Sequence, residues 1–385
     1  MAFNTPDIGV VFWNVGSGDS ISVIVDDDHW LQVDINHRSD ADEKDSVYAA
    51  VVDELVARLP KRNGRPYLAA FALTHPDKDH CQGFERLLDE VDIGELWFTP
   101  RVFDEPSEDL CEDAEAFKAE GERRVKKTIE KGGDVSSGDR VRLIGYSDRL
   151  KQKPYVGFPE DKLTVPGSAV ESLDSVDLAD SFRAFVHAPF KENLYEGRDR
   201  NDTSLAMQVR LIEDGAESNL LLFGDHSYPG LRKIFDVNKH EDDLSWGVFL
   251  APHHCSKSAM HWADTSDEDP TFRQDIMDDI KDSKAEPGYV VASAEPVPAS
   301  NKKGDNPPHA KAKRRYEEII ESGHFRVTQE ELSKDAPEPI AFEATADGFA
   351  LMGEASKSKK ENKAKATVAA AVATPSSPRA SQRYG

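Results

Sequence analysis

The sequence contains few cysteines and no long apolar run. Cys81, Cys111 and Cys255 are odd in number and widely spaced along 385 residues, which excludes the disulfide framework of a small secreted protein. No apolar stretch has the length of a membrane span, and the N-terminal segment lacks a basic region followed by a long apolar run. The sequence therefore predicts a cytoplasmic protein with no membrane association.

Positive charge is also scarce. The chain has 48 Lys and Arg against 72 Asp and Glu, a formal net charge of −24. Such a charge repels polyanions at long range and argues against nonspecific coating of DNA. It does not exclude a nuclease, because bound divalent metals can supply the positive charge that the side chains lack.

The first third of the chain alternates strand and helix patterns. Short β-branched or aromatic segments predict an opening antiparallel meander over residues 8–35. Helical spacing of apolar residues follows, and then a short apolar strand, 67–74. A second helix over 81–91 and a strand over 93–100 predict an α/β fold. Residues 104–200 are less regular, and we interpret them as partly an insertion, with a charged, solvated helix over 112–133.

Regular patterns return after residue 200. The expected elements are strands 204–212, 218–225, 246–252, 288–294 and 325–330, helices 228–237 and 310–322, and a final strand pair within 339–352. We expect one body, residues 1–353. Residues 354–385 are basic, rich in Ala, Ser and Lys and low in complexity, which predicts a disordered tail.

Ligand chemistry is concentrated directly after the strand 67–74. The stretch HPDKDH places His75, Asp77, Asp79 and His80 within six residues. Imidazoles and carboxylates at this spacing suit zinc or manganese, and two adjacent ions could share them in pairs. The alternative is a polar turn whose aspartates cap a helix.

Two other apolar strands end in similar residues. Asp225 closes the segment LLFGD, and His253 and His254 follow the segment WGVFLAP. A lone Asp after a strand is usually a turn residue, but coincident placement at three strand ends favours one shared site.

Several segments together resemble the metallo-β-lactamase fold, and within it the hydrolase domain of the competence protein ComEC and its standalone bacterial relatives. The matching segments, which span residues 8 to about 350, are FWNVGSGDSISV, LTHPDKDHCQGF, NDTSLAMQV, LLFGD, LAPHHCSKSA and NPPHAKAKRRY. Asp77 stands where many relatives have His, a frequent variant in this branch, and Cys255 stands where a Gly is usual.

The resemblance implies a four-layer αββα sandwich with a dinuclear metal site at one edge of its two sheets. It also implies that Asp225 bridges two divalent ions. The remaining ligands would be His75 and Asp77 on the first ion, and Asp79, His80 and either His253 or His254 on the second.

The ligand set differs from the usual pattern at one position. The usual third histidine of the first ion has no clear counterpart, and Asn201 or Asp202 stands near its place. We interpret Asp19 and Asp34 as orienting histidines rather than binding metal. Zinc is the expected metal, and manganese is the alternative. Asp77 adds negative charge to the site, which favours harder ions and phosphate chemistry.

These features predict a hydrolase in which two metal ions activate a water that Asp79 or Asp225 orients. Lys257, Ser256 and His309 are candidates to contact phosphate oxygens or to protonate a leaving group. Cys255 is expected to be a packed small residue, with metal binding and redox sensitivity as alternatives.

Three functions remain open from the sequence. The expected substrate is a phosphodiester, either DNA, which would make the protein a nuclease, or a nucleotide or other small molecule. A partner-binding module of a multi-protein bacterial system, with weak activity, is the third alternative. β-Lactam hydrolysis is disfavoured by the absence of an export signal and by Asp77.

Overall fold

The computed structural model describes residues 3–104, 110–192, 200–238, 241–265 and 268–353. The predicted tail, 354–385, lies outside the described residues. Among the helices in these ranges, none combines the length and apolar character that a membrane crossing requires.

The first sheet begins with the predicted meander and continues as parallel strands. Strands β1, β2 and β3 pair antiparallel in sequence order, and β3 then pairs with β5 in parallel. The strands lie in the order β21 (Gly348–Leu351), β20 (Ile340–Thr345), β1 (Gly9–Phe12), β2 (Ile21–Ile24), β3 (Trp30–Val33), β5 (Arg65–Ala72), β6 (Asp92–Phe98), β7 (Arg140–Ile144) and β8 (Leu163–Thr164), with β4 (Lys61–Arg62) paired to β5.

The second sheet is built from the later half of the chain. Its order is β19 (Phe325–Val327), β18 (Lys284–Ala292), β15 (Trp246–Leu250), β14 (Ala216–Leu222), β13 (Ala206–Glu213), β12 (Phe182–Ala188) and β9 (Ala169–Val170). Strands β14, β15, β18 and β19 run parallel, so the segments that follow β14 and β15 leave the sheet at the same edge.

The two sheets pack face to face around one apolar core. Val10 and Val33 of the first sheet share this core with Met207 and Val291 of the second, and all four are buried. Alternate residues of each strand point away from this core to the opposite face, so each sheet carries a second apolar face that helices must cover.

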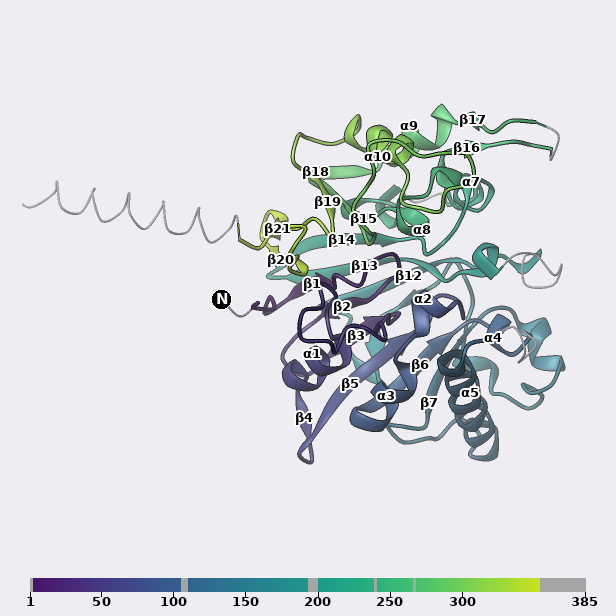
Figure 1. Cartoon of the computed structure of the whole chain (residues 1–385). Helices are drawn as coiled ribbons and strands as arrows, with labels where there is room; N and C mark the ends of the chain where they lie inside the picture. The colour runs from purple at the N-terminus through teal and green to yellow at the C-terminus, as the bar shows by residue number, and fades with distance from the viewer. Residues whose placement is uncertain (1–2, 105–109, 193–199, 239–240, 266–267, 354–385) are drawn as a thin grey trace, which may run out of the picture.

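Helices cover both outer faces (Figure 1). Leu55, Phe84 and Phe117 from three helices pack on the first sheet, and Leu231 and Tyr316 are among the helical residues that pack on the second. The helices are α1 (Val51–Arg58), α3 (Phe84–Glu90) and α5 (Glu112–Glu130) on one side and α7 (Tyr228–Val237), α9 (Gln274–Asp282) and α10 (Ala310–Glu317) on the other. The four-layer αββα sandwich that the resemblance implied is therefore confirmed.

Residues 104–200 contribute strands to both sheets. They supply β7 and β8 to the first sheet and β9 and β12 to the second. The helix α5 is not fully solvated as predicted, because Ala114, Phe117 and Val125 are buried against the sheet while its charged residues face outward. Further described elements are a short helix, α4 (Arg101–Asp104), and two small antiparallel strand pairs, β10 (Ser172–Leu173) with β11 (Val176–Asp177) and β16 (His261–Trp262) with β17 (Thr271–Phe272).

Candidate metal centre

Chain segments that follow parallel strands form the site, where the two sheets meet. Helix α2 (Lys78–Cys81) follows β5, Asp225 follows β14, and the turn α8 (Pro252–Cys255) follows β15. The turn between β1 and β2 adds Asp19, whose backbone N–H donates to the Asp79 carbonyl at 3.1 Å. Four separate segments thus meet at one point, and both sheets contribute.

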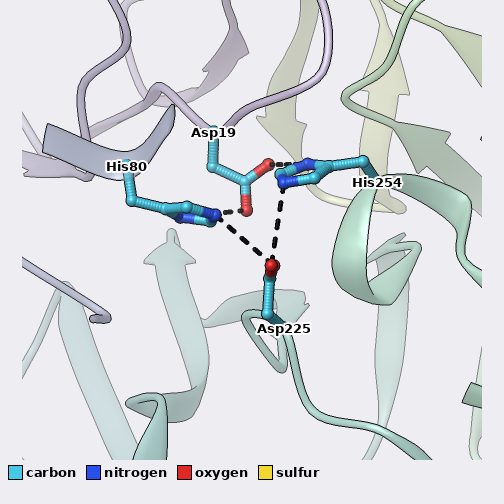
Figure 2. Close-up of side chains that lie close together, drawn as sticks. All are labelled: Asp19, His80, Asp225 and His254. Carbon is cyan, nitrogen blue, oxygen red and sulfur yellow. Dashed lines mark ion pairs between the residues drawn. The ribbon is translucent and has the colours of Figure 1, made fainter. Parts of the chain in front are cut away.

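Four buried side chains form the centre of the site (Figure 2). Asp19, His80, Asp225 and His254 each offer one ligand atom, and these atoms lie within 4.8 Å of one another. We call this set the ligand group. Two carboxylates and two imidazoles at this spacing can hold a divalent metal ion.

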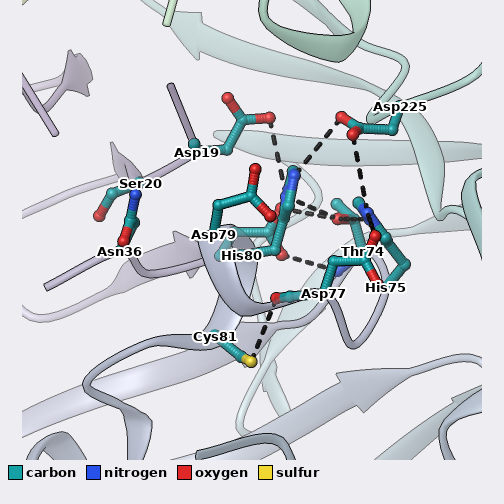
Figure 3. A network of polar contacts seen from close by, with 12 residues as sticks. Asp19, Ser20, Asn36, Thr74, His75, Asp77, Asp79, His80, Cys81 and Asp225 are labelled. Carbon is teal, nitrogen blue, oxygen red and sulfur yellow. Dashed lines mark hydrogen bonds and ion pairs between the residues drawn. The ribbon is translucent and has the colours of Figure 1, made fainter. Parts of the chain in front are cut away.

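Figure 3 shows the polar contacts around His80, and a further contact with the carboxylate of Asp34 holds this ring. Its Nδ1 lies 2.7 Å from Asp34 Oδ2, and both residues are buried. Asp34 also accepts hydrogen bonds from Thr74, through the backbone N–H at 2.7 Å and the hydroxyl at 2.6 Å. The expected contact between Asp34 and a histidine is therefore present, and it holds Nδ1 as the hydrogen-bond donor and directs Nε2 toward the centre.

The same tautomer follows for two other histidines. His75 Nδ1 lies 3.0 Å from the Thr74 hydroxyl oxygen, which accepts because its own proton goes to Asp34. His254 Nδ1 donates to the Ser293 carbonyl at 3.2 Å. Each ring thus directs its Nε2 to the opposite side, where that atom can bind a metal ion when it carries no proton.

The atoms that face the centre have no hydrogen-bond partner. They are His75 Nε2, His80 Nε2, His254 Nε2, Asp19 Oδ1 and Asp225 Oδ1, all buried. A buried polar atom left without a partner destabilises a fold by roughly 1–3 kcal/mol, so five in one place call for a shared ligand. Nitrogen lone pairs and carboxylate oxygens are the donors that divalent transition metals use, and the residues present therefore fit a metal site.

Asp225 lies at the middle of the cluster. Its Oδ1 is 3.4 Å from His80 Nε2, and its Oδ2 is 3.8 Å from His75 Nε2 and 3.8 Å from His254 Nε2. Burial raises the pKa of this carboxyl, but the His254, His80 and His75 rings lower it by more, so the pKa stands well below its ordinary value. Asp225 is therefore an anion facing three imidazoles, a position from which it could bridge two ions.

Asp77 and Asp79 lie on either side of this point. Asp77 Oδ2 is 3.5 Å from His75 Nε2. The other carboxylate oxygen, Oδ1, is 3.0 Å from a terminal guanidinium nitrogen of Arg200. Asp79 Oδ2 is 3.2 Å from His254 Nε2. The Asp79 side chain is 43% exposed, so this carboxylate can meet both the buried histidines and solvent.

The two adjacent histidines of α8 occupy different positions. His254 is buried within the ligand group, whereas His253 is 29% exposed and its Nε2 lies 3.6 Å from Asp225 Oδ2. Both are in the left-handed backbone region, with φ near 50°, and Cys255 follows at 65°. Three consecutive non-glycine residues in this region are strained by roughly 1–2 kcal/mol each, and such strain is typical of functional sites.

Cys255 packs into the core between the second sheet and its helices. Burial raises the pKa of its thiol to about 12. Its left-handed backbone is one that Gly adopts without steric strain. Cys81 Sγ lies 3.5 Å from Cys111 Sγ, and all three cysteines are free.

The remaining predicted residues lie outside the ligand group. Asp202 is in the 3₁₀ turn Arg200–Thr203. Lys257 begins the 3₁₀ turn Lys257–Ala259, and its backbone N–H donates to His309 Nδ1 at 3.2 Å. His309 in turn donates its backbone N–H to the Cys255 carbonyl at 3.0 Å. The structure thus places Lys257 and His309 beside the His253 turn.

Three residues near the site were not predicted in these roles. Asp19 was expected only to orient histidines, and its carboxylate lies within the ligand group, 3.5 Å from His254 Nδ1. Arg200 pairs with Asp77, and buried His226 donates from Nε2 to the Ser204 carbonyl at 3.0 Å. Burial lowers the pKa of His226 to about 4. The sequence signals were GSGDS, RNDTS and FGDHS, each a polar run beside an apolar strand.

Comparisons with known proteins find limited likeness. No family model matches, and no curated protein matches. Solved structures that match include metallo-β-lactamase SMB-1 bound to 2-mercaptoethanesulfonate, with 11% identity, a TM-score of 0.30, and coverage of 64% of this chain and 77% of that one. SMB-1 in complex with mercaptoacetic acid has 11% identity, a TM-score of 0.28 and coverage of 65% and 80%. MEM-A1, a subclass B3 metallo-β-lactamase from a soil metagenome library, has 11% identity and a TM-score of 0.28. The match covers 64% of this chain and 80% of that one.

Proposed function

We propose that this chain is a metal-dependent hydrolase of phosphodiesters. The observation that carries the proposal is the convergence of five buried, unpartnered nitrogen and oxygen atoms on one point. Two further carboxylates, Asp77 and Asp79, lie beside them, at 3.5 and 3.2 Å from ring nitrogens. This excess of donors over the four that one tetrahedral ion uses supports two ions, with Asp225 between them.

Each ion would have its own set of residues. His75 and Asp77 would hold one, and Asp79, His80 and His254 the other, with zinc as the expected metal and manganese the alternative. Bound divalent ions would lower the pKa of a water and offset negative charge on the phosphate. Asp202 is a further candidate for the first ion, because it lies in the turn that carries Arg200, and His253 is a further candidate for the second, because it faces Asp225.

The chain's own residues would then handle protons and charge. The partly exposed carboxylate of Asp79 can accept a hydrogen bond from the attacking water and take its proton. Attack at phosphorus breaks one P–O ester bond, and the leaving oxygen gains a proton. His309 or Lys257, both beside the His253 turn, would supply that proton or contact the phosphate.

Asp77 supports phosphate over amide chemistry as the reaction class. A carboxylate in place of a neutral imidazole adds negative charge and favours harder ions. The three free thiols fit action in the reducing cytoplasm.

Elemental analysis and a chromogenic diester test the proposal together. We expect about two divalent ions per chain, and hydrolysis of bis-p-nitrophenyl phosphate that stops on chelation. Asp79→Ala and Asp225→Ala should each lower turnover by about 100-fold or more, because each would position the water and hold metal. Asp161→Ala is the matched control, since Asp161 is 77% exposed. Absence of bound metal after gentle purification, with no uptake of added zinc or manganese, would contradict the proposal.

A further inference from the structure

A hollow beside the metal centre gathers positive charge in a strongly acidic protein. Its volume is about 400 Å³, and its lining includes Lys257, Lys302, Lys303, Lys311 and Arg314. We call it the basic hollow. Among the lining residues that the structure describes, Asp269 is the one that carries a carboxylate, within a chain of net charge −24.

The cations of the basic hollow have no carboxylate partners. Among the residues that the structure describes, none of the five forms an ion pair. Elsewhere the arginines are paired repeatedly: Arg86 contacts three carboxylates and Arg232 contacts three. Five neighbouring unpaired cations repel one another, and an acidic surface offers many carboxylates that could have neutralised them. Their clustering around one hollow, without an ion pair among the described residues, indicates a site for an external anion.

The lining of the basic hollow includes two residues that lie beside the His253 turn. Lys257 and His309 line it, and they are joined by a hydrogen bond of 3.2 Å from the Lys257 backbone N–H to His309 Nδ1. His309 bonds to the Cys255 carbonyl, immediately after His253 and His254. In the same turn, His253 Nε2 lies 3.6 Å from Asp225 Oδ2. A chain of direct contacts therefore connects the hollow to the centre of the ligand group.

Two structural elements hold the cations in place. Lys311 and Arg314 are exposed on α10, three residues apart and so on one face of the helix. Lys302 and Lys303 are exposed on the preceding loop, which Asn301 ties to α10 by accepting the Ala310 N–H at 2.8 Å. The loop also holds Asp305, whose carboxylate accepts a hydrogen bond from the Lys302 backbone N–H at 2.7 Å. Among the described residues, this carboxylate forms no ion pair with the Lys302 side chain.

We propose that the basic hollow binds phosphate groups adjacent to the scissile diester, so that the natural substrate carries several phosphates. This inference rests on the proposed function, because it assumes that a phosphodiester reaches the metal centre. Lys302, Lys303, Lys311 and Arg314 are then specificity residues that touch flanking phosphates and not the reacting atoms. The substrate could be a single nucleic-acid strand or a small polyphosphorylated molecule, which share this chemistry.

Two double variants test the basic hollow, Lys302→Gln/Lys303→Gln and Lys311→Gln/Arg314→Gln. The matched control, Lys126→Gln/Lys131→Gln, removes the same charge from exposed positions on α5 and just after it. The probes are a labelled single-stranded oligonucleotide of about 12 nucleotides and inorganic tripolyphosphate. Binding is measured by fluorescence anisotropy and calorimetry at about 50 and 200 mM salt, and circular dichroism checks the fold.

We expect each hollow variant to weaken oligonucleotide binding by about tenfold at low salt and to lower the salt slope by about 0.7 for each phosphate that is no longer neutralised. The control should match the parent, and turnover of bis-p-nitrophenyl phosphate should stay within about twofold, because that diester has no second phosphate. Weakened binding of tripolyphosphate alone would support the inference with a small substrate. Unchanged binding of both probes would overturn it.

The outcome separates this inference from the proposed function. Suppose that the parent hydrolyses no diester with any metal, but the hollow variants bind the anionic probes more weakly than the parent does. The proposed function then fails, and the anion site stands. If the parent hydrolyses bis-p-nitrophenyl phosphate and the variants bind both probes as the parent does, the function stands and the anion site fails.

Discussion

At the scale of single residues, the site depends on which ring nitrogen carries the proton. Asp34, Thr74 and the Ser293 carbonyl each bond to a histidine Nδ1, and the three Nε2 atoms are left facing Asp225. A ring free to flip would present N–H to the metal half of the time. The residues behind the histidines therefore fix the donor set before any metal binds.

Asp34→Asn tests this arrangement. The amide would direct an N–H toward Thr74 or His80, both of which donate to Asp34 in the parent, so one hydrogen bond must be lost. We expect metal affinity to fall by about 10–100-fold, measured by competition with a chromogenic chelator. Asp161→Asn makes the same chemical change at an exposed position. Parent-like affinity in Asp34→Asn would show that Asp34 does not orient His80.

The sequence predicted that residues after three strands share one site, but it did not predict that Asp19 and Arg200 join them. His75, Asp79, Asp225 and His254 follow apolar strands, and strand ends that share one edge must lie close together. Asp19 lies in a turn before a strand, where a carboxylate is ordinarily a turn residue, so its place in the ligand group depends on packing between segments. The same holds for Arg200, since an ion pair with Asp77 spans more than a hundred residues.

At the scale of elements, a glycine sets the path of the chain out of the metal motif. Helix α2 ends at Cys81, and Gly83 then takes φ of 93° before α3 begins at Phe84. The predicted single helix over 81–91 is therefore wrong at its start, because apolar spacing does not show where a left-handed residue interrupts a helix. The interruption turns α3 onto the sheet while α2 keeps His80 in the site.

Gly83→Ala should destabilise the protein strongly. A Cβ at this position would lie 2.5 Å from His37 Cβ, and the left-handed backbone adds strain. We expect the free energy of unfolding to fall by about 2–4 kcal/mol, from about 1–2 for the backbone and the rest for the clash. The measurement is urea denaturation followed by tryptophan fluorescence.

Gly132→Ala provides the matched control for this change. Gly132 has φ of 58°, but no heavy atom lies within 4 Å of the position that an alanine Cβ would take, so only the backbone strain of about 1–2 kcal/mol remains. Equal losses in the two variants would show that the contact between Gly83 and His37 has no role in the stability of this region.

Helices were predicted unevenly in this chain. Helix α7 was predicted with its observed bounds, whereas α9 was not predicted, because its nine residues are mostly charged and only Ile276, Met277 and Ile280 are buried. In α5 the many charges concealed a narrow apolar stripe. A charged sequence can still pack when its few apolar residues share one face, and only the sheet beneath shows that they do.

At the scale of the whole molecule, buried neutral histidines make stability depend on pH. His187 lies in the second sheet, with Nε2 2.9 Å from the Asp243 carbonyl, and Arg183 and Asp243 are the nearby charged groups. Burial lowers the pKa of His187 to about 4, against an ordinary 6.5. Below pH 6.5 the unfolded chain binds a proton that the folded chain rejects, so stability is lost as the pH falls toward 4.

His187→Gln isolates this contribution, since Gln keeps an N–H donor but does not titrate. Between pH 7 and pH 5 we expect the parent to lose about 2 kcal/mol more unfolding free energy than the variant. Urea denaturation at both pH values measures the difference. An identical pH dependence in the two proteins would show that His187 is protonated in the folded state.

Residues 354–385, which follow the body, are expected to be dispensable for hydrolysis. The final strand β21 pairs with β20, and Met352 donates its backbone N–H to the Ala341 carbonyl at 2.8 Å, so the described contacts of the sheet are complete before residue 354. The sequence of 354–385 has too few apolar residues to offset the entropy of ordering it. A truncation after Glu354 should therefore keep the metal content and the turnover of bis-p-nitrophenyl phosphate.

The same truncation has a second expected effect, because KSKKENKAK is a basic segment in an acidic protein. Any loss should appear only in affinity for an oligonucleotide or an acidic partner, and only at low salt, where screening is weak. This salt-dependent loss would add to that of the basic-hollow variants, since the two segments carry separate charges. If the truncated protein stayed folded but no longer hydrolysed the small diester, the tail would have to act at the metal centre, and the boundary at residue 353 would be wrong.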